Sequence, residues 1–427
     1  MSSRSGRHWA RAVRGSAAAS TGRRIRQASI VAQLALSLAL LVSAALVIQS
    51  FVSLRSVDPG FDAAGRVTMS YFAPRARYAD AGRLVALVER MREEIGRAPG
   101  VRAVGIAQAL PFAPGVVWLQ AATRDDPRGV ANLAALPHVH YNVVSAGYAE
   151  ALGVPTRAGR TFDATDTAGS APVVVINDAL ARRFFPGQDP IGQSLWVGHA
   201  QALPTLPRRT IVGVIGDARW SGLDEPAGPE AWIPYAQQAG GEDILRTMYV
   251  VFHAADAEAA MPGVRAQVAR ADPDLPLTSV RTLASRLDEA VWRQHLAAVT
   301  LGALGIAALA VALMGVLTVT SYLVGRRSHE MGVRLALGAR PQAIVAMVLV
   351  ESGRLVVVGT GLGVLGALAM GRLLSTMLYG VGASDAPTFV ATGGALVVTA
   401  IAACYLPARR ASRVDPLVTL RSGRADG

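Results

Sequence analysis

The sequence contains no lysine, so all 42 of its basic residues are arginines. A Walker A loop needs a lysine that contacts the nucleotide phosphates, and a Schiff-base enzyme needs a lysine amine. The 427 residues therefore exclude both kinds of site. If nucleotide hydrolysis drives this protein, we expect the hydrolysing site on another chain.

Cysteine is nearly absent as well, and the single residue, Cys404, lies in an apolar run. One thiol can form neither an internal disulfide nor a cysteine zinc site, so we expect a small side chain that is buried or faces lipid. The sequence also lacks a G-x-S-x-G elbow and an H-E-x-x-H motif. We therefore predict no catalytic residue, no metal site and no cofactor, and we do not expect an enzyme.

Few other side chains are candidates for metal binding or catalysis. His138 and His140 would share one face of a strand, but a zinc site needs three or four ligands. No cysteine or dense acidic cluster accompanies them, so we expect surface or interface histidines. Two acidic pairs in turn-like sequence are expected to be solvated, Asp125–Asp126 and Asp224–Glu225.

Charged residues make up only 17% of the chain, and the mean hydropathy is +0.34. This mixture is too apolar for an ordinary soluble enzyme and too polar for a protein that lies wholly in a membrane. A spanning helix needs roughly 20 apolar residues. We predict four spans, at about 28–51, 297–323, 352–374 and 388–406. The first is too long for a cleaved signal sequence, so we expect an uncleaved anchor. The third is the weakest by length, and it spans if Arg354 and Arg372 extend to opposite interfaces.

The arginines are distributed unevenly between the predicted spans. Residues 1–27 carry seven arginines and no acid, and segments 325–342 and 407–427 each carry a net charge of +3, whereas segment 57–295 carries −2. Positively charged segments next to spans stay in the cytoplasm, so the large segment is expected outside. This distribution accounts for the pI of 10.8 without nucleic-acid binding.

The large external segment is predicted to mix α and β structure. A helix is expected at 80–97, because its apolar residues recur at helical spacing on one face, and Asn177 stands where it would cap a short helix that follows it. A further helix from about residue 282 is expected to run unbroken into the second span and to couple motion on the two sides. Strands are expected at 67–73, 101–110, 171–176, 210–218 and 248–254.

A glycine motif in the third span invites a second interpretation. Gly361, Gly363 and Gly366 match G-x-G-x-x-G, which is typical of dinucleotide sites. The motif lies inside an apolar span, however, and Gly359 and Gly363 have the small-xxx-small spacing of closely packed membrane helices. We expect helix packing.

The stretch RRSHEMGVRLALGAR, residues 326–340, lies between the second and third spans. Arg326, Glu330 and Arg334 are four residues apart and share a helix face. Gly338 suits a helix end and Pro341 the first turn of the next helix. Two interpretations of a short amphipathic helix remain open on this pattern. It lies in the lipid headgroups, or it is a docking helix for a cytoplasmic partner, for which an ATPase is the natural candidate.

Several stretches together resemble FtsX-like permeases with a MacB-like periplasmic core. RRSHEMGVRLALGA is similar to the loop of these permeases between their second and third spans. The resemblance covers nearly everything after residue 28, and it is closest to the C-terminal half of duplicated orphan permeases. The other motifs that carry it are 141–162, 173–195, 211–226, 377–389 and 405–421.

The resemblance implies a mechanism without catalysis in this chain. Such permeases form dimers, and each protomer places its coupling helix on an ABC ATPase, whose ATP-driven closure moves the spans and the external domains. It also implies a second permease protomer or half, membrane lipids and an envelope partner in the periplasm. It assigns the ATPase contact to Arg326, Arg327, Glu330, Met331, Gly332, Arg334, Leu335 and Leu337.

The expected protein is thus a multi-pass inner-membrane permease subunit of an ABC exporter or mechanotransmission complex, with a separate ATPase. The alternative is a membrane-anchored periplasmic ligand-binding or structural protein that needs no ATPase. The fold class is a membrane protein with four transmembrane α-helices and a large α+β periplasmic domain between helices 1 and 2. The expected division is a basic cytoplasmic tail at 1–27, helix 1 at 28–51, the MacB-like core at 52–295, the FtsX-like domain at 296–406 with a coupling helix at 326–338, and a basic tail at 407–427.

Overall fold

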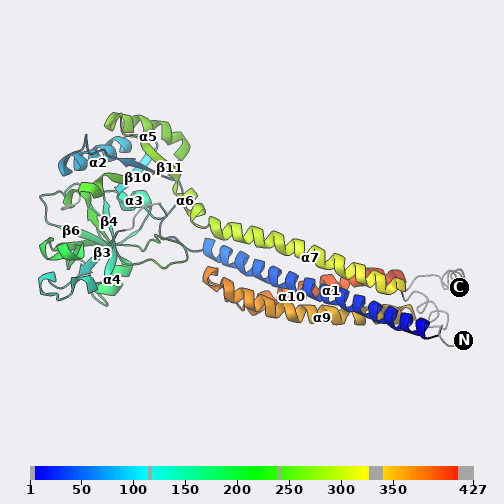
Figure 1. Cartoon of the computed structure of the whole chain (residues 1–427). Helices are drawn as coiled ribbons and strands as arrows, with labels where there is room; N and C mark the ends of the chain where they lie inside the picture. The colour runs from blue at the N-terminus through cyan, green and yellow to red at the C-terminus, as the bar shows by residue number, and fades with distance from the viewer. Residues whose placement is uncertain (1–4, 114–117, 239–241, 327–339, 412–427) are drawn as a thin grey trace. The chain divides into compact units, whose positions relative to one another are not determined.

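The computed structural model describes residues 5–113, 118–238, 242–326 and 340–411. The chain divides into two compact units, which we call the helical unit (residues 1–55 and 293–427) and the α+β unit (residues 56–292). The predicted fold class, four apolar helices with a large α+β domain inserted between the first and the second, is confirmed (Figure 1).

The helical unit consists of α1 (Ser5–Arg55), α7 (Trp292–Arg326), α9 (Pro341–Leu374) and α10 (Ala386–Ala411), with the 3₁₀ turn η6 (Ser375–Met377) after α9. Each of the four contains a stretch long and apolar enough to cross a membrane: Gln27–Arg55, Trp292–Tyr322, Val345–Leu374 and Ala386–Tyr405. The third stretch begins earlier than the predicted residue 352, so its length is no longer limiting. Pro341 opens α9, as predicted.

The expectation of one unbroken helix into the second span is wrong. Helix α6 (Leu283–Ala290) ends before Val291, and α7 starts at Trp292. Val291 has φ −104° and ψ 4°, outside the α-helical region. A β-branched residue has a weaker preference for helix than its neighbours Ala290 and Leu287, so the interruption falls where helix propensity dips.

The α+β unit contains eleven strands among the described residues, together with α2 (Ala81–Gly96), α3 (Tyr148–Leu152), α4 (Asp178–Phe184) and α5 (Ala257–Ala271). The strands are β1 (Arg66–Phe72), β2 (Val101–Ala107), β3 (Trp118–Thr123), β4 (His138–Val144), β5 (Thr156–Gly159), β6 (Val173–Asn177), β7 (Ser194–Gly198), β8 (Arg209–Ile215), β9 (Glu230–Pro234), β10 (Thr247–Ala254) and β11 (Leu277–Thr282).

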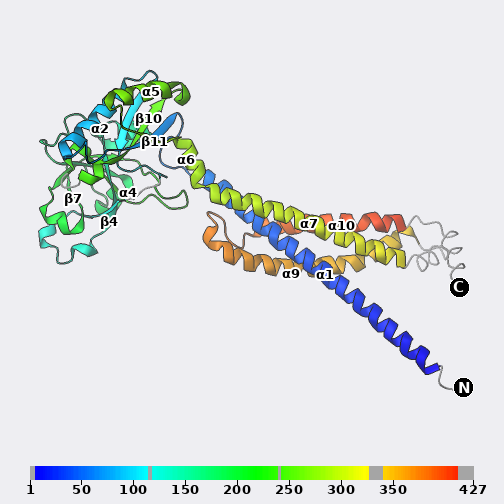
Figure 2. The same ribbon diagram turned by 45° about the horizontal axis from the view of Figure 1, so that its top comes forward.

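Four antiparallel strands in the order β11-β1-β10-β2 form one part of this unit. Helices α2 and α5 lie side by side against it, as Figures 1 and 2 show. The apolar stripe of α2, which includes Leu84 and Met91, packs in one core with Met69 and Tyr71 of β1. A second core contains α3 and Leu283 of α6, together with residues of β2 and β10. The sheet is therefore buried on both faces.

Six other strands close a ring, because each pairs with the next in the order β4, β3, β7, β8, β6, β9 and β9 returns to β4. Strand β5 adds to β8. A single ladder pair, Ala107 with Val144, joins the ring to β2 of the four-stranded part. A closed ring leaves few unpaired strand edges.

Buried Asn177 shows how the sequence fixes local structure in the ring. Its Oδ1 accepts hydrogen bonds from the backbone N–H groups of Leu180 (2.9 Å) and Glu230 (2.8 Å), and its Nδ2 donates to the carbonyl of Gly228 (2.8 Å). The predicted cap of α4 is thus confirmed, and the same side chain also holds the start of β9.

Replacing Asn177 by alanine should destabilise the α+β unit by about 2 kcal/mol or more, because buried backbone groups lose their partners. Chemical denaturation of the full-length protein, followed by tryptophan fluorescence, measures this loss. Asn132→Ala is the matched control, since exposed Asn132 also caps a turn through Ala134 but is solvated. Equal effects of the two variants would contradict the role assigned to Asn177.

Candidate functional site

The candidate coupling segment lies between α7 and α9. Arg326 is the last residue of α7, and Arg340 precedes Pro341 at the start of α9, where the N–H of Ala343 donates to the carbonyl of Arg340 (2.9 Å). The other predicted contact residues lie outside the described residues: Arg327, Glu330, Met331, Gly332, Arg334, Leu335 and Leu337. The structure therefore describes the two helices that carry this segment.

Helix α1 packs closely against α9 through two glycines. A Cβ added at Gly359 would lie 2.8 Å from the Cβ of Leu34, and one added at Gly363 would lie 2.8 Å from the Cβ of Leu38. Real Cβ atoms do not approach so closely, so only glycine permits this contact. The predicted packing role of the glycine pair is confirmed.

Helix α1 also meets α7. The hydroxyl of Ser37 donates to the carbonyl of Ala308 (2.8 Å), and a Cβ added at Gly305 would lie 3.6 Å from the Cα of Leu41. Leu34, Leu38 and Leu46 of α1 are fully buried. Helix α1 is thus the central element of the helical unit, whereas α7 and α9 expose many apolar side chains.

A buried polar cluster joins α7, α9 and α10 within about two turns of the end of α7. The hydroxyl of Thr320 lies 3.5 Å from that of Ser352 and 3.8 Å from the sulfur of Cys404. Cys404 is 2% exposed, which confirms the buried alternative for this side chain. Small polar residues of this kind connect helices where no water is present.

At the other end of α1, one contact reaches the loop between α9 and α10 and another reaches the first turn of α10. The backbone N–H of Tyr379 donates to the hydroxyl of Ser50 (2.8 Å), and the hydroxyl of Thr388 lies 3.0 Å from Oε1 of Gln49. Asp385 caps α10 through the N–H of Thr388 (3.1 Å). Helix α1 is therefore tied to its neighbours near both ends of its apolar stretch.

The α+β unit contains a buried carboxyl group that the sequence did not reveal. Glu230 is 1% exposed and accepts hydrogen bonds from the indole N–H groups of Trp220 (2.7 Å) and Trp232. Burial raises its pKa to about 7, a shift that the two indole donors oppose and the charge of Asp217 reinforces. His140 is its register partner on β4, and burial lowers the pKa of that histidine. No sequence pattern distinguished this glutamate from a solvated one.

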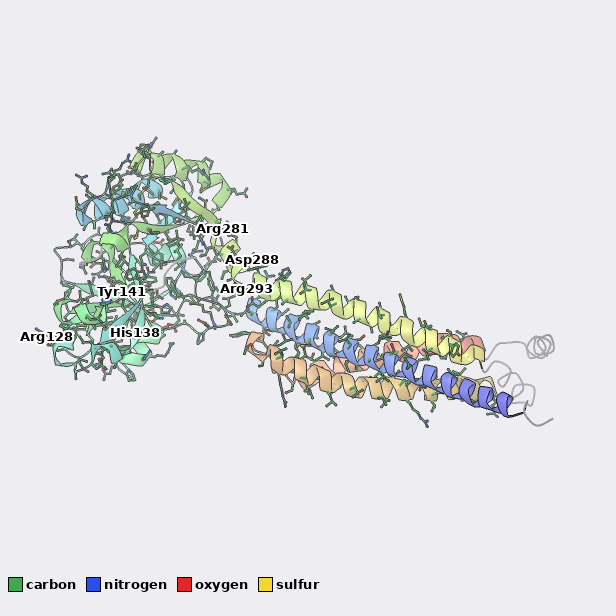
Figure 3. All side chains as sticks on the ribbon, viewed as in Figure 1. Arg128, His138, Tyr141, Arg281, Asp288 and Arg293 are labelled. Carbon is green, nitrogen blue, oxygen red and sulfur yellow. The ribbon has the colours of Figure 1, made fainter. Side chains whose placement is uncertain are left out.

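The histidines and acidic pairs are only partly as expected. His138, labelled in Figure 3, is exposed, whereas His140 is half-buried with its ring 6.0 Å from that of Trp220. Both acidic pairs are exposed, as predicted, and Asp126 forms an ion pair with Arg128 (2.7 Å). Among the described residues, no group of three or more histidine, cysteine or acidic side chains is placed to hold a metal ion.

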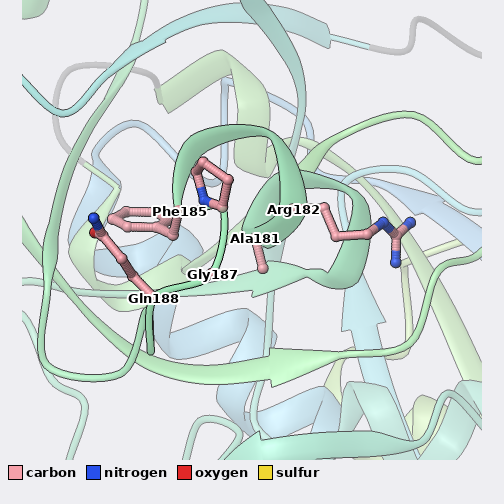
Figure 4. A pocket seen from close by; sticks show the side chains of 6 residues that line it. Ala181, Arg182, Phe185, Gly187 and Gln188 are labelled. Atoms are coloured by element: carbon pink, nitrogen blue, oxygen red, sulfur yellow. The ribbon is translucent and has the colours of Figure 1, made fainter.

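Open surface cavities occur among the described residues of the α+β unit, including these two. One of about 420 Å³ lies at the end of α4 and is lined by Ala181, Arg182, Phe185, Pro186, Gly187 and Gln188 (Figure 4). The guanidinium of Arg124 lies 4.4 Å from the ring centre of Phe185. The other, of about 540 Å³, is bordered by Asp58, Asp62, Asp178 and Asp217, and the last three pair with arginines. Neither cavity contains a recognisable catalytic arrangement.

Comparison with known proteins gives two family matches that cover most of the chain. A model of the MacB-like periplasmic core domain matches residues 30–271, and a model of the FtsX-like permease C-terminal domain matches residues 302–416. Two solved structures are also similar, at TM-scores of 0.35 and 0.32. They are the periplasmic region of MacB from Actinobacillus actinomycetemcomitans (11% identity, 55% of this chain and 95% of that one) and the extracellular domain of the transporter YknZ from Gram-positive bacteria (13% identity, 50% and 100%).

Curated relatives are longer than this chain. The macrolide export ATP-binding/permease protein MacB of Azoarcus sp. (strain BH72) is 28% identical over 66% of this chain and 42% of the relative. The pyoverdine export ATP-binding/permease protein PvdT of Pseudomonas putida is 29% identical over 64% and 42%. A MacB of Bradyrhizobium diazoefficiens is 30% identical over 66% and 43%. The matches thus span less than half the length of these relatives.

Substituting alanine for Gly363 should loosen the helical unit, because the new methyl group forces α1 and α9 apart at a cost of about 1–3 kcal/mol. The thermal midpoint of the detergent-solubilised protein, read by size-exclusion chromatography after heating, measures the loss. Gly361→Ala is the control on the same helix, since a Cβ there meets no atom within 4 Å. A matching loss in both variants would show that the close contact is not responsible.

The contribution of Glu230 to the unfolding free energy of the α+β unit should fall as the pH rises from about 4.5 to about 7. Folded Glu230 holds its proton up to about pH 7, whereas the unfolded residue releases it near its ordinary value of 4.5, so the folded state binds the extra proton in this window. The expected contribution is roughly 3 kcal/mol. Glu230→Gln should remove it, and Glu225→Gln, an exposed control, should not. A Glu230→Gln variant that keeps the full pH dependence would rule out this assignment.

Proposed function

We propose that this chain, which belongs to the family of FtsX-like permeases with a MacB-like periplasmic core domain, is the membrane subunit of an ABC-type exporter or mechanotransmission complex. It is a multi-pass inner-membrane protein, and the α+β unit is its periplasmic domain. The observation that carries the proposal is the match to both family models, in the family's order, over residues 30–271 and 302–416.

In the proposed mechanism, ATP is hydrolysed by an ABC ATPase that is a separate chain. The ATPase contacts residues 326–338, and Arg326, Arg327, Glu330 and Arg334 supply the charged part of that contact. Met331, Gly332, Leu335 and Leu337 supply its apolar part. Arginine suits this role because its planar guanidinium binds carboxylates through two parallel hydrogen bonds.

Movement of the coupling segment is proposed to reach the periplasm through the helices. In the sequence, α7 is followed by residues 327–339 and then by α9, and α9 packs on α1 without room for an extra methyl group at Gly359 or Gly363. Helices in such close contact move together, since sliding would require their backbones to separate. A displacement applied at the cytoplasmic ends of α7 and α9 would therefore also move α1.

Two such chains, or this chain and a related half, are proposed to assemble as a dimer around two ATPase subunits. The exposed apolar side chains of α7, α9 and α10, including Met314, Val357 and Val390, supply surfaces for lipid and for the second protomer. A periplasmic envelope partner completes the proposed assembly and contacts the α+β unit.

Reversing the charge of both Arg327 and Arg334 to glutamate should abolish co-purification with the ATPase, because the net charge of the contact then falls by four and the new carboxylates repel acidic partners. The complex is purified from native membranes through a tag on this chain, and the bound ATPase is identified by mass spectrometry.

Arg421→Glu with Arg424→Glu is the control, since it changes the charge of the C-terminal segment by the same amount. Both double variants should remain in the membrane fraction. Undiminished recovery of the ATPase with the Arg327/Arg334 variant would exclude the docking role. Absence of any ATPase from the wild-type preparation would favour the alternative of a membrane-anchored binding or structural protein.

A further inference from the structure

The polypeptide crosses between the two units at two junction segments. The first junction (residues 56–65) follows α1 and leads into β1, and the second junction is α6, which is separated from α7 by Val291 alone. In a protein whose function is to transmit movement, these junctions must be attached firmly to the α+β unit. Each is attached through a buried arginine.

Arg66 holds the first junction. Its guanidinium is buried, and Nη1 donates to a carboxylate oxygen of Asp62 (2.5 Å) and to the carbonyl of Ala64 (3.0 Å), both in the junction. Nε donates to the carbonyl of Ala151 at the end of α3 (2.9 Å). A Cβ added at Gly153 would lie 2.7 Å from Nη2, so the guanidinium rests directly on the backbone that ends α3.

Backbone contacts fix the first junction further. The N–H of Arg219 donates to the carbonyl of Pro59 (2.9 Å), and Phe61 is buried in the core that contains α3. Gly60 has φ +83°, and a Cβ there would lie 1.8 Å from the carbonyl oxygen of Asp217. Movement of this segment therefore displaces the strands and helix beneath it.

Arg286 holds the second junction. It lies on α6 and is 2% exposed; its Nε donates to the hydroxyl of Thr68 on β1 (2.7 Å) and its Nη2 to the carbonyl of Ser279 on β11 (3.2 Å). Burial lowers its pKa. Ser279 has φ +52° and lies in a bulge where β11 shifts register against β1, an arrangement that redirects its carbonyl.

Both arginines are connected to strand β1, Arg66 as a residue of the strand and Arg286 through its hydrogen bond to Thr68. Arg66 is the first residue of β1, and Thr68 is two residues further along the same face, about 7 Å away. Strand β1 is paired with β11 on one side and β10 on the other. A buried arginine that has lost its hydration is kept only where several acceptors are fixed around it, so both contacts constrain geometry strongly.

We infer that Arg66 and Arg286 are positioning residues that deliver the movements of α1 and α7 to strand β1, which then carries the sheet β11-β1-β10-β2 with it. This inference rests on the proposed function and adds the residues through which force enters the periplasmic domain. The break at Val291 makes the attachment of α6 necessary, because helical continuity does not supply it.

The test uses the full-length protein with its co-purified ATPase in lipid nanodiscs. Hydrogen–deuterium exchange of residues 66–72 and 247–254 is compared with and without ATP, and ATP hydrolysis is measured in the same samples. The variants are Arg286→Met and Arg66→Met, which keep an apolar stem but lose every donor. Their exposed controls are Arg128→Met, which breaks an ion pair with Asp126, and Arg157→Met, whose partner is Asp178.

In both buried-site variants, the difference in exchange with and without ATP should be smaller than in the wild type by roughly threefold or more. ATPase binding and ATP hydrolysis should persist. Thr68→Val, which removes the hydroxyl and keeps the shape, should reproduce the Arg286→Met result, and Thr68→Ser should not. The exposed controls should behave like the wild type.

An unchanged ATP-dependent difference in Arg286→Met and Arg66→Met would overturn the inference, as would an equal loss in the exposed controls. A general rise in exchange across the α+β unit without ATP would show that the arginines only hold the fold together, and would also overturn it. If the wild type itself binds no ATPase or shows no ATP-dependent change, the proposed function fails, and the transmission role fails with it.

Discussion

Backbone-to-backbone contact between α1 and α9 is the interaction on which the helical unit depends. In hydrocarbon, apolar side chains gain nothing by leaving lipid for one another, so helices associate through close packing and a few polar contacts. Gly359 and Gly363 let the two backbones approach, and Ser37, Ser50 and Thr388 add polar contacts around the same central helix. Helix α1 is therefore held in close contact with α9 and is hydrogen-bonded to α7.

The α+β unit is stabilised in a different way from the helical unit, because its strands are held by hydrogen bonds and by a core that excludes water. Its four-stranded part and its closed ring share one hydrophobic core, and one ladder pair, between Ala107 and Val144, joins their strands. Both junctions adjoin β1 of the four-stranded part, and the first junction also contacts Asp217 and Arg219, which follow β8 of the ring. Buried charges with several fixed partners resist displacement, so the contacts of Arg66 and Arg286 hold the two junctions on the α+β unit, and Arg286 does so next to the helix break at Val291.

Much of the architecture was predictable from the sequence, since it depends on strong local signals. The apolar runs, the glycine pair and the cap at Asn177 are each recognisable within one short stretch of sequence, and the arginine distribution follows from counting charges between the runs. The ring was not predictable, because β4 and β9 pair across about ninety residues of intervening chain. Glu230 and Arg286 resemble ordinary surface residues in sequence, and only the fold buries them. The break at Val291 follows from a propensity difference too small to have been decisive, and the coupling residues 327–337 lie outside the described part of the chain.

The burial of Cys404 among α7, α9 and α10 makes site-specific labelling of this protein possible without first removing a native cysteine. It is the chain's sole thiol, and it is shielded from water. A thiol-reactive label added to the solution would therefore leave Cys404 unlabelled. One cysteine introduced on either junction would then be the single labelled residue. The hydroxyl of Thr320 lies 3.8 Å from the sulfur of Cys404. Thr320→Cys would therefore place two sulfurs next to each other, and their oxidation would link α7 and α10 by a reversible disulfide.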